Sequence, residues 1–543
     1  MSREASQIED ISPNLSEQPR EKGFAFATFL VIVGLILSRS TGFIREMLVS
    51  SKFSSDLQEA FALAFLIPDF VYQLLVGGAI QAAITPSLAR SLQLGDEKRG
   101  LRSASIFISI AAVVMGITVI AGILLSETVY PLFFSNPEKL ETVMIAAKAA
   151  RILFPQIFFM MLAAFSIGIL NAYKKFTATS MGPAVYNIFV LLAIILWGGP
   201  SDSALYRTII GIMIAALLYF LFQLAVGNKY LRKFHFSLHT HDSGFRSLFR
   251  LAIPILVSSA IIQLNTIIIS WFANYLPENL QFPIRNAVTL WQLPYGIFAV
   301  GVGTVMLPSL AGHFAAGKSQ LASNLLSSSL RNALFMTIPM TGFLIMMPTD
   351  IIAAVFRWNS NYSAERILNT SHLLLGYSAA VIIHTVIFIY NQAYYAIGKT
   401  KMPLFSGLIS LVVVLAGNFV LIIVNPNSNP IYLTLSYSLA SLISALFLVL
   451  NYRQYRDLVP TGILSFSIKA AICLLSLVVV LFFMNRFDYS PTGKMTEILL
   501  VTVKGTVGLI VYLSCAALLK MPELQSFVRR VQRRFLRKQL PDE

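Results

Sequence analysis

Three ionisable side chains lie in or beside the first long apolar stretch of the sequence. The segment "LSRSTGFIREML" begins at Leu37 and contains Arg39, Arg45 and Glu46. An arginine near the middle of a membrane helix costs roughly 2.5–3.5 kcal/mol on insertion scales, so it needs a function or a partner. At about 3.6 residues per turn, Arg39 and Glu46 share one helix face and Arg45 lies beside it. We expect Arg39 to face a water-filled cavity, Glu46 to reach the outer interface, and Arg45 to do one or the other.

Other cationic side chains lie in later apolar stretches. Lys148 and Arg151 are three residues apart and share a helix face, and Arg285 opens the eighth stretch. The alternative for each is a place at the membrane surface. Arginine binds oxyanions through two parallel hydrogen bonds, whereas a cation exporter would need buried carboxylates. The buried charge is therefore expected to be cationic, which predicts an anionic substrate and suggests a phosphorylated one.

A polar group follows a proline in the second stretch. Asp69, Tyr72 and Gln73 come directly after Pro68, and a further proline and a Gly-Gly pair predict a bent helix. Bent or broken membrane helices line cavities rather than lipid. We expect these side chains to face a cavity, with an ion pair between Asp69 and Arg39 as the structural alternative.

The sequence offers little enzyme chemistry. It has no Walker motif and no nucleophile–base constellation in its polar parts, so we expect neither an enzyme nor a cofactor. His235, His239, His241 and Asp242 have the side chains of metal ligands, but they lie in a basic loop and we expect no metal there. The net charge of +16 lies mainly between the apolar stretches, which favours a role in topology over nucleic-acid binding.

The composition is that of a membrane protein. Of the 543 residues, 56% are hydrophobic and 12% are charged, which is about half the charge of a soluble domain. Apolar runs long enough to cross a bilayer recur along the chain, which predicts an all-α polytopic membrane protein. We count fourteen spans, at 24–50, 57–89, 103–126, 141–172, 177–198, 204–228, 246–275, 284–312, 320–347, 363–397, 402–424, 431–451, 462–485 and 496–519.

The charge of the loops predicts the orientation. Lysines and arginines gather in the loops that follow even-numbered spans, whereas the other loops are sparse in them and include acidic residues. Basic loops stay in the cytoplasm, so both termini are expected to be cytoplasmic.

Short sequence words recur about 220 residues apart. "PSLA" occurs at Pro86 and Pro308, and asparagine-containing words occur around Asn171 and Asn391. Six spans separate the members of each pair, so the repeats have the same orientation, and a substrate route is expected between the repeated halves. The predicted parts are a disordered tail (1–23), an N-lobe of spans 1–6 (24–228), a cytoplasmic loop (229–245), a C-lobe of spans 7–12 (246–451), spans 13–14 (452–519) and a basic cytoplasmic tail (520–543).

The opening "SRSTGFIREMLVSSKF" and the later "LWQLPYGIFAVGVGTVMLPSLA" resemble the MurJ (MviN) family of lipid II flippases, within the multidrug/oligosaccharidyl-lipid/polysaccharide exporter superfamily. The resemblance covers about residues 24–455. It implies transport of an undecaprenyl-pyrophosphate-linked disaccharide-pentapeptide across the bacterial inner membrane by alternating access, in peptidoglycan biosynthesis. It also implies membrane lipid as a partner and cell-wall synthesis proteins as candidate partners.

The sequence departs from this family at three places. The family usually has arginine where this chain has Tyr72 and Gln73, and again where it has Thr289. Arg285 lies one turn before Thr289 and could compensate, as could the two cations of span 4. The candidate substrate-binding residues are Arg39, Arg45, Asp69, Tyr72, Gln73, Lys148, Arg151, Arg285, Thr289 and Gln292.

Three functions follow from these observations. The first is a lipid II flippase, the second a flippase or exporter of another polyprenyl-linked glycan or anionic amphiphile, and the third a non-transporting paralogue. The driving force stays open among membrane potential, protons and sodium, with His384 and Asp69 as candidates for coupling. The central expectation is that positive side chains at bilayer depth, chiefly Arg39, hold a diphosphate between the two lobes.

Overall fold

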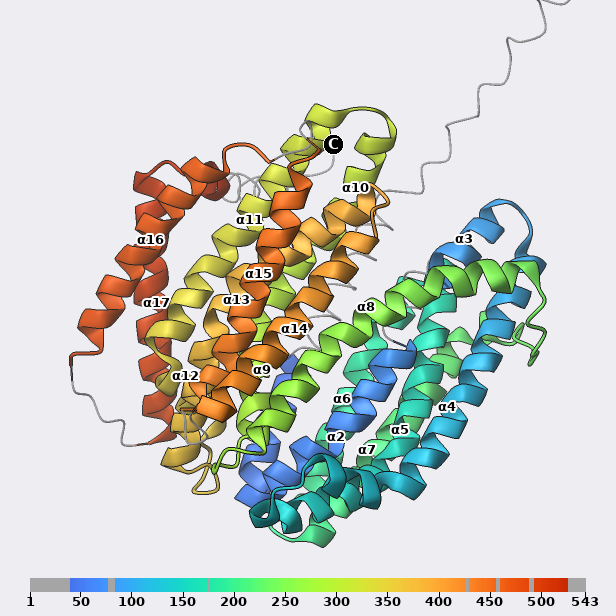
Figure 1. The fold of residues 1–543 in the computed structure, drawn as a ribbon, viewed down its shortest axis with the longest axis horizontal. Coiled ribbons are helices and arrows are strands. Elements are labelled where there is room, and N and C mark those ends of the chain that lie inside the picture. Colours follow the sequence, from blue (N-terminus) through green and yellow to red (C-terminus); the bar gives the residue numbers. More distant parts are fainter. Residues whose placement is uncertain are drawn as a thin grey trace, which may run out of the picture.

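The computed structural model describes residues 40–76, 84–173, 175–424, 429–455, 460–487 and 493–525. Within these ranges the regular structure is entirely helical, and the helices form two side-by-side lobes (Figure 1). The described helices include ten that are long and apolar enough to cross a membrane, and an eleventh when the bent pair α11–α12 is taken as one span. The chain is therefore a multi-pass membrane protein, as predicted.

The N-lobe is built around one central helix, α5. The small residues Ala146, Ala147, Ala149 and Ala150 are fully buried on it, which lets its neighbours α2, α4 and α7 approach closely. The N-lobe consists of the helical stretch 40–52, α2 (Ser55–Val76), α3 (Thr85–Gln93), α4 (Glu97–Phe133), the short 3₁₀ helix η2 (Pro137–Lys139), α5 (Leu140–Ala172), α6 (Phe176–Trp197) and α7 (Asp202–Leu231).

The C-lobe repeats this plan around α13. This helix packs against α9, α11 and α15, and it carries Asn391, the counterpart of Asn171 on α5 in the predicted repeat. The C-lobe consists of α8 (Ser243–Ala273), α9 (Gln281–Pro294), η3 (Tyr295–Ala299), α10 (Val300–Ala315), α11 (Ser319–Met346), α12 (Pro348–Phe356), α13 (Ala364–Ala396), α14 (Lys401–Val424) and α15 (Ile431–Tyr452).

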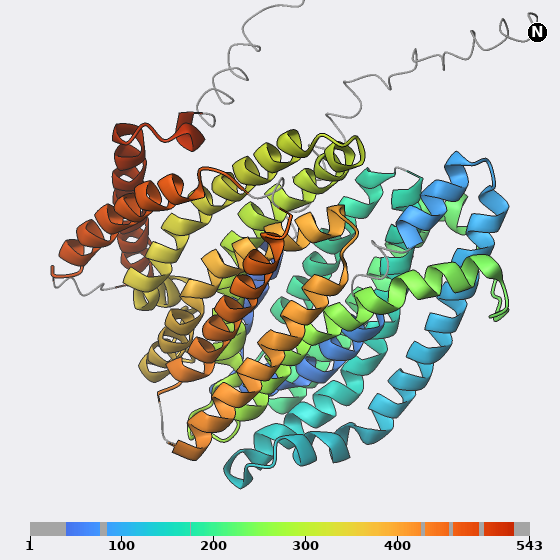
Figure 2. The same ribbon diagram turned by 45° about the horizontal axis from the view of Figure 1, so that its top comes forward.

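Helix α8 crosses from one lobe to the other (Figures 1 and 2). Asp242 caps its first turn by accepting a hydrogen bond from the Phe245 amide at 2.8 Å, and Ser103 on α4 donates to the same carboxylate at 3.2 Å. A Cβ at Gly244 would lie 2.1 Å from the Ser103 hydroxyl, so a larger residue would have to displace this hydroxyl from Asp242. Farther along, α8 packs against α14, so it joins the lobes rather than belonging to the C-lobe alone.

A π-helical turn interrupts the predicted span 284–312. Helix α9 ends at Pro294, and η3, from Tyr295 to Ala299, connects it to α10. Proline lacks the amide hydrogen that a regular α-helix needs, and π-turns inside helices are frequent at functional sites. Trp291 and Gln292, near the end of α9, and Tyr295, at the start of this turn, line a cavity in the C-lobe.

The remaining helices form the edge of the C-lobe. Helices α16 (Ile463–Met484) and α17 (Lys494–Leu518) pair with each other, and α17 is held to the short α12 by ion pairs of Lys504 with Asp350 and of Arg357 with Glu497. The sequence did not predict α12, which bends by 87° from α11. Otherwise every predicted span from 57–89 onward coincides with one helix or with consecutive helices. The predicted N-terminal tail (1–23) and most of the predicted basic tail (520–543) lie outside the described residues.

Candidate functional site

A polar cavity of about 290 Å³ lies between the two lobes. Its walls come from the stretch 40–52 and α2 of the N-lobe, and from α8 and α9 of the C-lobe. The polar residues that line it are Arg45, Glu46, Asp69, Gln263, Thr266, Ser270, Gln281, Arg285, Thr289 and Gln292. Five of these, Arg45, Asp69, Arg285, Thr289 and Gln292, are among the predicted candidates.

One buried carboxylate joins two arginines from opposite lobes. Glu46 is only 1% exposed, and its Oε1 accepts hydrogen bonds from Arg45 Nε at 3.0 Å and Nη2 at 2.8 Å. Arg285 on α9 binds the same carboxylate with two parallel bonds, from Nε to Oε2 at 3.0 Å and from Nη2 to Oε1 at 3.1 Å. The planar guanidinium fork suits this bidentate geometry. The Arg285–Glu46 ion pair therefore joins the lobes, and a phosphate oxyanion could accept the same two hydrogen bonds from Arg285.

Aromatic rings support Arg285 from the N-lobe side. Its guanidinium carbon lies 5.3 Å from the ring centre of Phe61 and 5.0 Å from that of Phe65, both buried on α2. A cation over an aromatic face is stabilised by the ring quadrupole. These contacts keep the guanidinium over the cavity, where 18% of the Arg285 side chain remains exposed.

The charges of the described residues that line the cavity cancel, whereas the predicted excess of positive charge includes Arg39, which lies outside the described residues. Arg45 and Arg285 supply two positive charges, and Glu46 and Asp69 supply two negative ones. The expectation that Glu46 reaches the outer interface was wrong, because its carboxylate is buried between the two arginines. Helical periodicity could not show that Arg285, 239 residues later, approaches from the other lobe.

The other candidate residues lie elsewhere. Tyr72 packs against the apolar core of the N-lobe, and neither it nor Gln73 lines the cavity. Lys148 is exposed on α5, and Arg151 pairs with Glu127 at 3.0 Å on an exposed surface, so the structure does not bring them to the cavity. Arg39 lies outside the described residues, and its proposed role stays a prediction.

A second buried ion pair joins the lobes near the end where α2 begins. Glu59 on α2 accepts hydrogen bonds from the amides of Gln281 at 2.7 Å and Phe282 at 3.3 Å, at the start of α9, and from Arg366 on α13 at 3.1 Å. A helix N-terminus favours a negative charge, and the arginine completes its neutralisation. We call these four residues the latch.

The latch was not predicted from the sequence. Glu59 and Arg366 each lie within a few residues of the start of a predicted span, where a charged side chain is usually solvated. The structure instead leaves them 2% and 5% exposed. The sequence did contain one signal for this contact. Glu59 and Gln281 are 222 residues apart, which is close to the spacing of about 220 residues between the repeated sequence words.

Two lobes of apolar helices with the same internal plan and a polar cavity between them define a membrane transporter of the alternating-access type. The chain belongs to the family described as "Lipid II flippase MurJ", whose model matches residues 50–501. Members of this family are transporters, not enzymes.

Individual proteins are similar to this chain in sequence or in fold. The probable lipid II flippase MurJ of Bdellovibrio bacteriovorus is 26% identical over 71% of this chain and 74% of its own length. That of Borreliella burgdorferi is 23% identical over 93% of this chain and 99% of its own length. A solved structure of lipid II flippase MurJ in an inward closed conformation matches with a TM-score of 0.72 and 21% identity, over 90% of this chain and 98% of that one. An inward-facing multidrug resistance MATE transporter of the MOP superfamily matches with a TM-score of 0.61 and 13% identity, over 78% and 98% respectively.

Proposed function

We propose that this protein moves lipid II, the polyprenyl diphosphate-linked disaccharide-pentapeptide, from the inner to the outer leaflet of the bacterial inner membrane. Family membership supports this function. The observation that carries it is the convergence of Arg45 and Arg285, from opposite lobes, on one carboxylate inside a polar cavity. A bare diphosphate in hydrocarbon would be prohibitively costly, and these two guanidinium groups can replace its water.

Glu46 serves in this proposal as the resident counter-anion of the site. It occupies both arginines when substrate is absent, so an arriving diphosphate takes its place and releases the carboxylate from its bonds. The diphosphate takes over the hydrogen bonds that Glu46 makes in its absence, so the two guanidinium groups keep an anionic acceptor throughout loading. When the lobes move apart toward the outer leaflet, Glu46 competes for the arginines again and promotes release of the head group.

The latch closes one end of the cavity in this scheme. Glu59 and Arg366 hold the start of α2 against α9 and α13, and their loss would let the lobes rock apart at that end. The basic loops of the sequence lie at the opposite ends of the helices, which favours an outward-facing latch and cytoplasmic termini. We expect protein partners among the enzymes that make and use lipid II.

Replacing Glu46 with glutamine separates binding from release. A neutral amide holds the two arginines less strongly than a carboxylate, whose bonds are worth about 1.5–3 kcal/mol each. We therefore expect Glu46→Gln to bind undecaprenyl pyrophosphate about tenfold more tightly and to transport lipid II more slowly. Binding is measured on the full-length protein in nanodiscs. Glu127→Gln, which changes an exposed carboxylate outside the cavity, is the control, and weaker or unchanged binding by Glu46→Gln would contradict the counter-anion role.

A second candidate function is transport of another polyprenyl-linked glycan. Three uncharged residues favour this second function, because the family usually carries arginine at these places. They are Thr289 in the cavity and Tyr72 and Gln73 on α2. Expression in bacteria depleted of their own lipid II flippase decides between the two. Restored growth and cell shape support lipid II as the substrate. Lysis despite normal membrane insertion supports a different glycan.

A further inference from the structure

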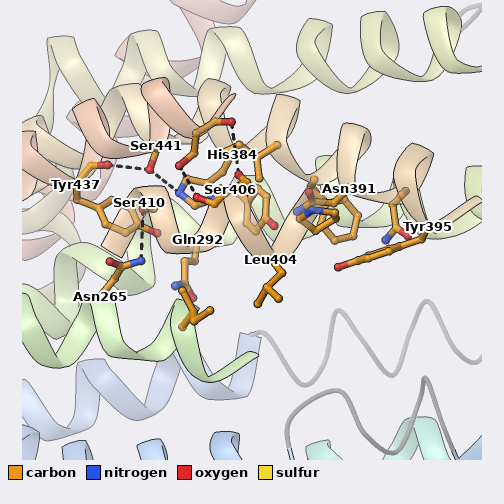
Figure 3. A pocket seen from close by; sticks show the side chains of 18 of the residues that line it. Asn265, Gln292, His384, Asn391, Tyr395, Leu404, Ser406, Ser410, Tyr437 and Ser441 are labelled. Carbon is orange, nitrogen blue, oxygen red and sulfur yellow. Dashed lines mark hydrogen bonds between the residues drawn. The ribbon is translucent and has the colours of Figure 1, made fainter. Parts of the chain in front are cut away.

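A second cavity, also of about 290 Å³, lies inside the C-lobe (Figure 3). Its walls come from α8, α9, η3, α13, α14 and α15. Asn265 and Ser410 lie toward one end, Asn391 and Tyr395 toward the other, and Gln292 between them (Figure 3). Gln292 also lines the cavity between the lobes, so the two cavities share a wall.

Aromatic rings form much of this wall. Trp291, Tyr295 and Tyr437 surround His384, whose ring stacks on that of Tyr437 at 5.3 Å with an interplanar angle of 10°. Phe388 extends the wall by an edge-to-face contact with Tyr295 at 6.1 Å. Such rings present flat apolar faces with polar atoms at their edges. The wall therefore suits a ligand that has an apolar face and polar edges.

Residues that line the cavity also carry polar atoms that lack partners. Within the described part of the chain, Asn265 Oδ1, Asn391 Oδ1 and Trp291 Nε1 are buried without a hydrogen bond. Asn265 and Trp291 are only 5% and 3% exposed. An unpaired buried polar atom costs about 1–3 kcal/mol, so two acceptors and a donor point to a polar ligand.

The chemistry of the wall excludes several other occupants. The described residues that line the cavity include no aspartate, glutamate, lysine or arginine, so a bound cation or phosphate would lack a counter-charge. A polyprenyl or acyl chain would leave the three polar atoms unpaired. A neutral ring with hydroxyl or acetamido groups satisfies both the aromatic faces and the orphan atoms.

We propose that this C-lobe cavity binds the first sugar of the polyprenyl diphosphate-linked head group. The inference rests on the proposed function, because it requires a diphosphate at Arg45 and Arg285. The first sugar is bonded directly to that diphosphate, so it must lie within one bond of the site, and the neutral cavity adjoins the site at Gln292, which lines both. The volume lies at the lower end of the roughly 300–1,000 Å³ typical of small-molecule sites, which suits one sugar and excludes the peptide.

Equilibrium binding of two lipids to the full-length protein in nanodiscs tests this proposal. Undecaprenyl pyrophosphate carries the diphosphate alone, and lipid II adds the sugars and peptide, so the ratio of their affinities isolates the contribution of the added groups. We expect Asn391→Ala to lower this ratio about 5–10-fold, the loss expected for one or two hydrogen bonds. Phe388→Leu removes a ring without removing a polar group and should lower it about threefold. Both variants should bind undecaprenyl pyrophosphate normally.

Two matched variants serve as controls for these changes. Asn451→Ala removes an asparagine from α15 outside the cavity, and Phe405→Leu removes an exposed ring from α14. Both should keep the ratio of the unchanged protein. If Asn391→Ala and Phe388→Leu kept the affinity ratio of the unchanged protein, the sugar subsite would be overturned. An equal loss of affinity for both lipids would also overturn it, because that result would indicate a binding site for the tail. If the unchanged protein bound neither lipid, the proposed function itself would fail, and the subsite with it.

Discussion

Arg285→Gln is expected to reduce lipid II transport about 100-fold. In the proposed mechanism the substitution removes two charge-assisted hydrogen bonds to the diphosphate, each worth about 1.5–3 kcal/mol, and a factor of ten corresponds to about 1.4 kcal/mol. Of the two arginines that bind Glu46, Arg285 is the one from the C-lobe, so the substitution also removes the contact of the C-lobe with this carboxylate. Rescue of a flippase-depleted strain and translocation of fluorescent lipid II in proteoliposomes both measure this loss.

Two further variants show whether the shape of the guanidinium or only its charge matters. Arg285→Lys keeps the positive charge but loses the bidentate fork, so we expect it to retain part of the activity, about tenfold below the unchanged protein. Arg151→Gln breaks an exposed ion pair outside the cavity and should transport normally. Full activity of Arg285→Gln, at normal abundance in the membrane, would exclude this residue from the substrate site.

Glu59→Gln is expected to open the latch end of the protein. The substitution leaves Arg366 buried without its counter-charge, and breaking a buried ion pair in this way costs about 3–5 kcal/mol. That cost falls on the conformation in which the lobes meet at the latch. We therefore expect the population to shift by about 100-fold or more toward the conformation that is open at this end.

Distances between spin labels measure this shift directly. In a protein with Cys473 and Cys515 replaced, labels at the exposed positions Asp56 and Ser360 report the separation of the lobes beside the latch. Glu59→Gln should add a longer distance that becomes the major one. Glu127→Gln, which breaks an ion pair within the N-lobe, should leave the distribution unchanged. A distribution in Glu59→Gln that matches the unchanged protein would show that the latch does not hold the lobes together.

The course of the helices was largely predictable from the sequence. Long apolar runs bounded by charged or turn-forming residues have few alternatives to membrane helices, which is why the predicted spans coincide with α2 to α17. The short words around Asn171 and Asn391 also identified two helices that occupy the centres of their lobes. The bend into α12 and the π-turn after Pro294 were not predictable, because they depend on packing rather than on hydrophobicity.

The candidate site was only partly predictable. Arginine in an apolar stretch is costly enough to attract attention, so Arg45 and Arg285 were singled out, and the structure places both on one cavity. Their neutralisation by Glu46 was not foreseen, because it depends on contacts between lobes that no local pattern encodes. The neutral cavity around His384 was missed for the same reason, since its aromatic and amide residues read individually as ordinary core positions. Substrate binding by any of these residues stays a prediction.

The central claim is that Arg45 and Arg285 recognise a diphosphate, and equilibrium binding tests it most directly. The full-length protein in nanodiscs is titrated with undecaprenyl pyrophosphate and with undecaprenol, which has the same chain without phosphate. We predict that the unchanged protein prefers the diphosphate at least about 100-fold, and that Arg45→Gln/Arg285→Gln binds both lipids within a few-fold of each other. An undiminished preference for the diphosphate in this folded double variant would contradict the account.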